Sequence, residues 1–110
     1  MTMGQMTVDE YDQLRPSVAV KYQGHKIRFS TPNMVTFLRA QHLLDKEPIT
    51  IEWILGFTPG DVLIDVGANV GTYSMFAAVM RDAKVYAFEP EAQNFALLNR
   101  NIALNEVSDH

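Results

Sequence analysis

One segment in the second half of the chain constrains the fold more than any other. Val62–Val66 is an apolar run interrupted by a single acid, which is typical of a strand in a parallel sheet covered on both faces. A loop with two glycines, Gly67–Gly71, follows it. Beyond the loop, apolar residues recur at the spacing of an amphipathic helix: Tyr73, Phe76, Ala77 and Met80. A second apolar run, Lys84–Phe88, and a second helical pattern to about Asn105 complete an α/β order that predicts the first βαβα half of a doubly wound fold.

The first half of the chain predicts smaller elements. Val18–Tyr22 and His25–Phe29 alternate apolar and other residues around a Gln-Gly pair, which indicates a β-hairpin. Ser30–Asn33 is a helix-start signal, with a hydroxyl cap followed by proline in the first turn. The helix after it is expected to place four apolar residues close to one face: Met34, Phe37, Leu38 and Leu44. A shorter helix is expected to begin at Pro48 and to end at Gly56.

These patterns divide the chain into three parts. Residues 1–17 are expected to be a loose leader, residues 18–60 an appendage with the hairpin and the two short helices, and residues 61–110 the α/β unit. A type II turn at Thr58–Asp61 ends the appendage. The α/β unit has only two expected strands, whereas sheets average about five or six. We therefore expect an incomplete domain that belongs to the N-terminal half of a larger protein.

Composition and charge exclude several classes of protein. The 110 residues include no cysteine, which excludes disulfides, thiolate metal clusters and a cysteine nucleophile. A net charge of −4 argues against a nucleic-acid partner. The sequence has no apolar run of membrane-spanning length and no signal-peptide core, so we expect a cytoplasmic protein with no membrane partner. The three histidines are isolated in the sequence, and no metal site is expected.

The glycine loop and a distant acid define a candidate nucleoside site. Ligands of open α/β sheets bind beyond the carboxyl ends of the strands, where both Gly67–Gly71 and Glu89 are expected. An acid at the end of the second strand can accept hydrogen bonds from both hydroxyls of a ribose. Asp65, expected to be buried, would order the loop or face a cationic group of the ligand. The structural alternative is that the glycines only turn and pack, and that Glu89 with Pro90 only starts a helix.

The spacing within the loop distinguishes between cofactors. The glycines are arranged as Gly67-x-x-x-Gly71, so the dinucleotide pattern G-x-G-x-x-G and the phosphate loop G-x-x-x-x-G-K-[ST] are both absent. S-adenosylmethionine, which carries no phosphate, fits the loop better. A nicotinamide-dependent oxidoreductase is the alternative among enzymes. A non-catalytic remnant or interaction module is the alternative outside them.

The same residues resemble a known family. Asp65–Tyr73 resembles the motif D-V-G-A-N-x-G-x-Y of the FkbM family of class I methyltransferases, and Phe88–Pro90 fits a second family segment. Thr31–Asn33 and Glu47-Pro48 fit it further upstream. The resemblance covers about Val18 to Asn105 and implies a Rossmann-like fold. It also implies methyl transfer from S-adenosylmethionine, most often to a hydroxyl oxygen of a small molecule or a sugar, with this fragment inactive alone.

The resemblance implies the cofactor-binding residues by their positions in the motifs. The residues for the methionyl side and the ribose, with their neighbours, are Asp65, Gly67, Ala68, Asn69, Gly71, Glu89 and Pro90. A second tier consists of Glu47, Thr36 and Asn33. The alternative for Glu47 is that it only precedes the proline that opens a helix. The partner is expected to be a small-molecule or glycan acceptor. The sequence identifies no general base and does not indicate an oligomeric state.

Two further expectations concern packing. Trp53 is expected to anchor the appendage to the α/β unit. Some of the asparagines of the last helix are expected to bond neighbouring loops or cap its end, because asparagine is a weak helix former: Asn94, Asn99, Asn101 and Asn105. Ser74 lacks the G-x-S-x-G context of a nucleophile.

Overall fold

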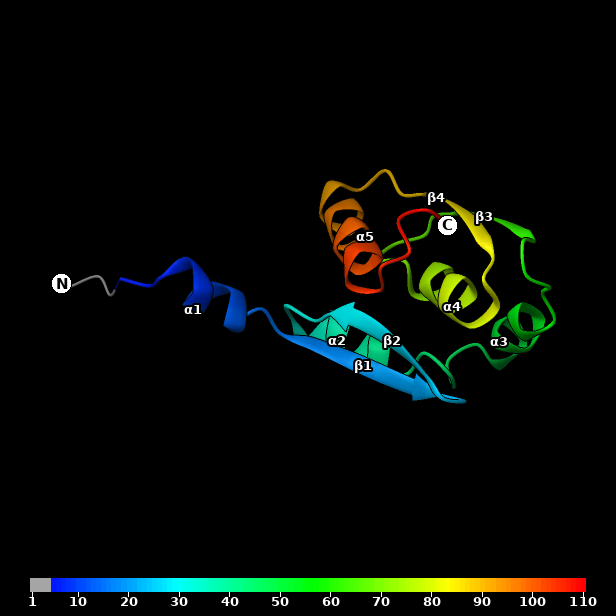
Figure 1. Ribbon diagram of the computed structural model, residues 1–110, viewed down its shortest axis with the longest axis horizontal. Helices are drawn as coiled ribbons and strands as arrows, with labels where there is room; N and C mark the ends of the chain where they lie inside the picture. Colours follow the sequence, from blue (N-terminus) through cyan, green and yellow to red (C-terminus); the bar gives the residue numbers. More distant parts are fainter. Residues whose placement is uncertain (1–4) are drawn as a thin grey trace.

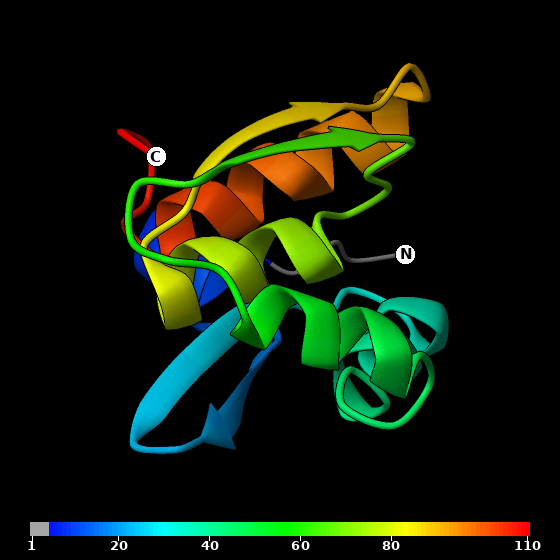
Figure 2. The same ribbon diagram turned by 90° about the vertical axis from the view of Figure 1, so that its right-hand side faces the viewer.

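The computed structural model describes residues 5–110, and its main elements are stacked in three layers (Figures 1 and 2). Strands β3 (Val62–Val66) and β4 (Lys84–Phe88) pair in parallel, with Val62 opposite Lys84 and Val66 opposite Phe88. Helices α4 (Thr72–Arg81) and α5 (Ala92–Leu104) lie together under one face of this pair, as Figure 2 shows. The expected order strand, helix, strand, helix is confirmed, and the fold is mixed α/β.

An antiparallel hairpin forms the layer on the other side of the helices. Strands β1 (Ser17–Tyr22) and β2 (His25–Ser30) are joined by Gln23-Gly24, which have positive φ angles of 46° and 81°. Two positive φ angles at these positions are the signature of a type I′ turn, so the expected hairpin is confirmed. Ile27 and Phe29 of β2 are buried in the core cluster beside residues of α4 and α5.

Two short helices connect the hairpin to the parallel pair. Helix α2 (Met34–Gln41) begins after Asn33, whose side chain accepts a hydrogen bond from the Thr36 N–H. The N-cap is therefore Asn33, and the expectation of a hydroxyl cap with proline in the first turn is wrong. Helix α3 (Pro48–Leu55) begins at the expected proline and is capped by Gly56.

The buried face of α2 differs from the expected one. Met34, Phe37 and Leu38 are exposed, whereas Thr36 and Ala40 are buried. Thr36 and Ala40 are four residues apart and have small side chains, so this face lets α2 lie close to the hairpin that it contacts. Three of the four residues of the expected stripe are therefore exposed, whereas Leu44, beyond the end of α2, packs partly buried against the core.

The expected loose leader contains a helix. Helix α1 (Val8–Gln13) lies at the N-terminal end of the described chain, away from the layered body (Figure 1). It follows Thr7, whose hydroxyl oxygen accepts a hydrogen bond from the Glu10 N–H at 3.1 Å and donates to the Glu10 carboxylate. The Thr7 side chain therefore caps the first turn of the helix. Residues 1–4 of the expected leader lie outside the described residues.

One face of the parallel strands is uncovered in residues 5–110. The apolar side chains that point away from α4 and α5 are 47–80% exposed: Val62, Ile64, Val66, Tyr86 and Phe88. This face has no cover among the described residues, because both helices lie on the same side of the strands. Trp53 is also 59% exposed and contacts Phe57 edge-on, so it does not anchor the two halves. Across the described residues, no helix combines the length and apolarity needed to span a membrane.

Candidate functional site

The loop between β3 and α4 is fixed against the end of β4. Gly67, Asn69 and Gly71 have positive φ angles of 74°, 56° and 87°. The N–H groups of Gly67 and Ala68 both donate to the Phe88 carbonyl, at 2.8 and 3.0 Å. The Gly71 N–H donates to the Ala68 carbonyl at 2.9 Å. The loop therefore uses its own amides to hold its shape.

The two glycines of the loop have different roles. A Cβ atom on Gly71 would lie 2.4 Å from Leu98 Cδ1, so this glycine lets α4 and α5 pack closely. A Cβ atom on Gly67 would meet nothing within 4 Å, so the space beside this residue is open. Gly71 thus serves packing, as the structural alternative holds, whereas Gly67 leaves room for a ligand beside the backbone.

Glu89 connects the end of β4 to the glycine loop. Its Oε1 atom accepts a hydrogen bond from the Asn69 N–H at 2.8 Å, and its Oε2 atom accepts from the Glu91 N–H at 3.0 Å. A carboxylate offers about four acceptor positions, so about two stay available to the hydroxyls of a ligand. The N-cap of α5 is Glu91, whose carboxylate accepts from the Asn94 N–H. Glu89 therefore takes part in the start of α5 through Glu91 and, in addition, holds the glycine loop through Asn69.

Asp65 is half-buried, not buried as expected. Its Oδ2 atom accepts a hydrogen bond from the Ser74 hydroxyl at 2.6 Å. Ser74 is fully buried in the first turns of α4, where this bond joins the helix to the end of β3. The Ser74 hydroxyl therefore holds the Asp65 carboxylate in position.

A cavity of about 310 Å³ opens between the glycine loop and the first half of the chain. Its walls are formed by Asp65, Gly67, Ala68 and Asn69 around the loop, by Thr72 and Tyr73 of α4, and by Arg39, His42, Leu43, Lys46 and Glu47. Five of the predicted residues therefore line one cavity: Asp65, Gly67, Ala68, Asn69 and Glu47. Glu89 is joined to this group through Asn69.

The other predicted residues do not line the cavity. Gly71 lies beneath Leu98, and Pro90 is exposed next to Glu89. Thr36 and Asn33 bond each other in the capping box of α2, with the Thr36 hydroxyl donating to the Asn33 carbonyl at 2.9 Å. Capping accounts for both of these second-tier residues.

Tyr73 is a cavity residue whose contact with Glu47 the sequence analysis did not foresee. Burial, and after it a hydrogen bond to Glu47, raise the pKa of Tyr73 to about 12. The tyrosine therefore stays protonated beside the Glu47 carboxylate. This contact joins the residue before α3 to the start of α4.

Three basic cavity residues were also missed. Arg39, His42 and Lys46 are three and four residues apart, a spacing that places side chains on one side of a helix and of the turn that extends it. That spacing is the signal that could have identified them. The structure adds that this side of α2 faces the glycine loop.

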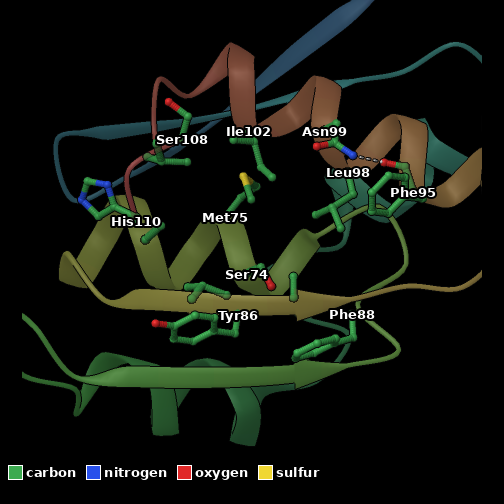
Figure 3. A pocket seen from close by; sticks show the side chains of 14 residues that line it. Ser74, Met75, Tyr86, Phe88, Phe95, Leu98, Asn99, Ile102, Ser108 and His110 are labelled. Atoms are coloured by element: carbon green, nitrogen blue, oxygen red, sulfur yellow. Dashed lines mark hydrogen bonds between the residues drawn. The ribbon is translucent and has the colours of Figure 1, made fainter.

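A second cavity of about 310 Å³ lies between β4, α4 and α5 (Figure 3). Its labelled side chains include Met75 of α4 and Leu98 and Ile102 of α5, and Ser108 and His110 close it from the C-terminal stretch. Its walls are mainly apolar, and none of the predicted cofactor residues lines it. Within residues 5–110, no cluster of three or more histidine, aspartate and glutamate residues could hold a metal ion.

Asparagines of α5 bond neighbouring segments as expected. Asn101 is fully buried, accepts from the Ser30 N–H at 2.7 Å and donates to the Val70 carbonyl at 2.7 Å. Asn105 accepts from the Arg28 N–H and donates to the Arg28 carbonyl, both at 2.7 Å. These side-chain amides pair with backbone groups at the outer edge of β2, much as another strand would. Asn101 also holds the glycine loop.

Two curated relatives are methyltransferases. The 31-O-demethyl-FK506 methyltransferase FkbM of Streptomyces tacrolimicus is 43% identical over 51 residues, which cover 46% of this chain and 20% of that protein. The hexuronic acid methyltransferase AglP of Haloferax volcanii is 27% identical over 88 residues, which cover 80% of this chain and 36% of that protein. No family model and no solved structure matches the chain. The comparisons support a relationship to methyltransferases, and the chain spans about a third or less of these relatives.

Proposed function

We propose that this chain is the N-terminal part of an S-adenosylmethionine-dependent methyltransferase related to the FkbM family. In this proposal, residues 61–110 form the first half of a Rossmann-like class I domain behind the appendage of residues 18–60. The acceptor is a hydroxyl of a small molecule or a glycan. The names of the two relatives, which refer to an FK506 precursor and to a hexuronic acid, include both kinds of acceptor.

One observation carries the proposal. The Glu89 carboxylate and the glycine loop lie at the same end of two parallel strands and are joined by the bond from the Asn69 N–H at 2.8 Å. Open α/β sheets bind nucleoside ligands at that end. A carboxylate with free acceptor positions suits the two hydroxyls of a ribose.

The amides of the loop favour a cofactor without phosphate. A dinucleotide site needs free N–H groups for its pyrophosphate. Here the N–H groups of Gly67, Ala68 and Asn69 already have acceptors, two on Phe88 and one on Glu89. The cavity also contains the carboxylates of Asp65 and Glu47, which would attract the positive charges of S-adenosylmethionine.

In the proposed reaction the protein contributes mainly by positioning. S-adenosylmethionine supplies an electrophilic methyl group on its sulfonium sulfur, for in-line attack by an acceptor oxygen. Glu89 would hold the ribose, and the open side of Gly67 would let the cofactor lie against the backbone. Asp65, held by Ser74, and Glu47, held by Tyr73, would face the cationic end of the cofactor.

Calorimetric titration of the chain tests this proposal. S-adenosylhomocysteine is expected to bind and NAD to give no heat above the dilution blank. Glu89→Ala should abolish binding of S-adenosylhomocysteine, whereas Glu52→Ala, which removes an exposed acid of α3, should leave it unchanged. Preference for NAD would favour the oxidoreductase alternative, and a folded chain that binds neither nucleoside would favour the interaction-module alternative.

A further inference from the structure

Three basic side chains form the wall of the cavity opposite the glycine loop. Arg39 lies in the last turn of α2, and His42 and Lys46 follow it. The same three side chains also line a shallower hollow on the outside of α2, with Val35, Leu38 and Asp45. The three side chains therefore lie where the cavity opens to the protein surface. They form a basic group in a chain whose net charge is −4.

Two of these cations have no partner among the described residues. Within residues 5–110 no carboxylate lies within ion-pair distance of Arg39 or Lys46, and neither side chain has a hydrogen bond. Arg39 is nevertheless half-buried. A guanidinium group presents five donors in a planar fork, so its natural partner is an oxyanion that can accept two parallel hydrogen bonds.

The other charged groups of the cavity are already engaged. Asp65 accepts from Ser74, and Glu47 lies beside Tyr73, whose pKa it helps to raise. His42 Nδ1 lies 3.2 Å from an oxygen of Asp45, which leaves its Nε2 atom free. Neither acid of the cavity pairs with Arg39, so its donors are open to a ligand that enters the cavity.

The position of Arg39 near the C-terminus of α2 explains in part why a cation is found there without a ligand. A cation there interacts favourably with the helix dipole. The helix dipole favours any cation at this position, and it leaves the hydrogen-bond donors of the Arg39 guanidinium unpaired. It also does not explain why Lys46, beyond the end of α2, faces the same cavity.

We propose that Arg39 and Lys46, with His42 beside them, bind a carboxylate group in this cavity. The inference deepens the proposed function and rests on it for the identity of the ligand. A carboxylate fits better than a phosphate because Asp65 and Glu47 line the same space and would repel a second negative charge. The carboxylate belongs either to the amino-acid end of the cofactor or to the acceptor.

The test compares two carboxylate ligands with related neutral compounds that lack the carboxylate. S-adenosylhomocysteine carries an amino-acid carboxylate, and 5′-methylthioadenosine lacks the amino-acid part. D-glucuronate carries a carboxylate, and methyl glucoside does not. The variant is Arg39→Gln with Lys46→Gln, and its matched control is Lys26→Gln with Arg28→Gln, two exposed cations of the hairpin. Dissociation constants are measured by calorimetry, and circular dichroism confirms that each variant is folded.

The expected result is that at least one carboxylate ligand binds the Arg39 and Lys46 variant about tenfold or more weakly, because the variant loses charge-assisted hydrogen bonds to the carboxylate. The neutral partner and the control variant should show no change. Weakening of S-adenosylhomocysteine alone assigns the carboxylate to the cofactor. Weakening of D-glucuronate alone assigns it to the acceptor.

The proposal is overturned if both carboxylate ligands bind the variant as tightly as the unmodified chain, or if neither binds the unmodified chain better than its neutral partner. Failure of the proposed function has a different result, in which neither adenosyl compound binds. In that case the comparison of D-glucuronate with methyl glucoside decides the carboxylate site without any nucleoside.

Discussion

At the scale of single residues, the contact between Tyr73 and Glu47 is the most direct link between the two halves of the candidate site. The pKa of Tyr73 is raised to about 12, first by burial and then by the hydrogen bond to Glu47. A raised tyrosine pKa means that the folded protein stabilises the protonated form, and this contribution is lost as the pH rises from about 10 to about 12.

Glu47→Gln should therefore lower the pKa of Tyr73 only in part, because burial remains. Ultraviolet titration of phenolate absorbance measures this pKa, and subtraction of the Tyr73→Phe titration isolates it from the other three tyrosines. Glu52→Gln, on the exposed side of α3, is the control and should leave the curve unchanged. An unchanged Tyr73 titration in Glu47→Gln would contradict the contact.

Substitution of the two loop glycines should separate packing from ligand access. Both have positive φ, so alanine costs about 1–2 kcal/mol at either position. Gly71→Ala adds a clash with Leu98, for which about 1–3 kcal/mol more is expected. Denaturant unfolding measures both losses, and Gly24→Ala, at φ 81° in open space, calibrates the backbone cost alone.

Gly67→Ala should destabilise the fold no more than Gly24→Ala does but should weaken binding of S-adenosylhomocysteine. Its Cβ atom would occupy the open space beside the loop. Equal binding by Gly67→Ala and the unmodified chain would mean that the ligand does not approach the backbone there.

At the scale of elements, α5 holds the hairpin and the glycine loop in place. Asn101→Ala removes the partners of the buried Ser30 N–H and of the Val70 carbonyl. An unsatisfied buried group costs about 1–3 kcal/mol, so we expect a loss of about 2–4 kcal/mol in the free energy of unfolding. Asn99→Ala, an exposed change on the same helix, should alter it by less than about 0.5 kcal/mol. Similar midpoints for the two variants in urea unfolding would refute the bridging role.

The C-terminal stretch returns to β4 and makes stability depend on pH. The His110 carbonyl accepts from the Val85 N–H at 3.2 Å, and its ring bonds Asp82. The hydrogen bond to Asp82 raises the pKa of His110 above 6.5, although burial acts in the opposite direction. The stabilisation is fully present below pH 6.5 and is lost as the pH rises through the raised pKa.

His110→Gln should therefore lower the free energy of unfolding at pH 6 and leave it nearly unchanged at pH 8.5. Urea titrations at the two pH values measure the difference. His25→Gln, at the exposed end of the hairpin, should show no such pH-dependent difference. Equal effects of His110→Gln at both pH values would rule out the protonated pair with Asp82.

The elements of the second half could be predicted because their apolar periodicity is strong. Val62–Val66 and Lys84–Phe88 are confirmed as strands with the expected bounds. The face of α2 could not be predicted from hydrophobicity, because small side chains, Thr36 and Ala40, pack against the hairpin. Helix α1 depends on the side-chain cap that Thr7 supplies, a local signal with no apolar stripe behind it.

The candidate site could be predicted only where its residues belong to one motif. The loop residues and Glu89 follow from the order strand, loop, helix, strand. The bond between Glu89 and Asn69 joins residues twenty positions apart and needs the register of the two strands. Arg39 and Lys46 could not be assigned, because a charged residue near a helix end is expected to face solvent unless the packing of that helix is known.

At the scale of the whole molecule, the uncovered sheet face agrees with the proposal that the chain is part of a larger protein. Val66, at 80% exposed, and Ile64, at 64%, lie on the parallel pair where an α/β sheet normally carries a second layer of helices. The matched regions cover 20% and 36% of the two curated relatives. The candidate cofactor site lies at the carboxyl ends of this pair and is built entirely from described residues.

The central claim is that a nucleoside binds at the glycine loop, and an amide shift map tests it most directly. The ¹⁵N-labelled chain is titrated with S-adenosylhomocysteine, and the shift of each backbone N–H is followed. The account predicts that the largest shifts fall on Gly67–Gly71 and Glu89–Glu91, which meet through the bond between Asn69 and Glu89. Shifts confined to the apolar cavity around Tyr86 and Ile102, or no shifts at a saturating concentration, would contradict it.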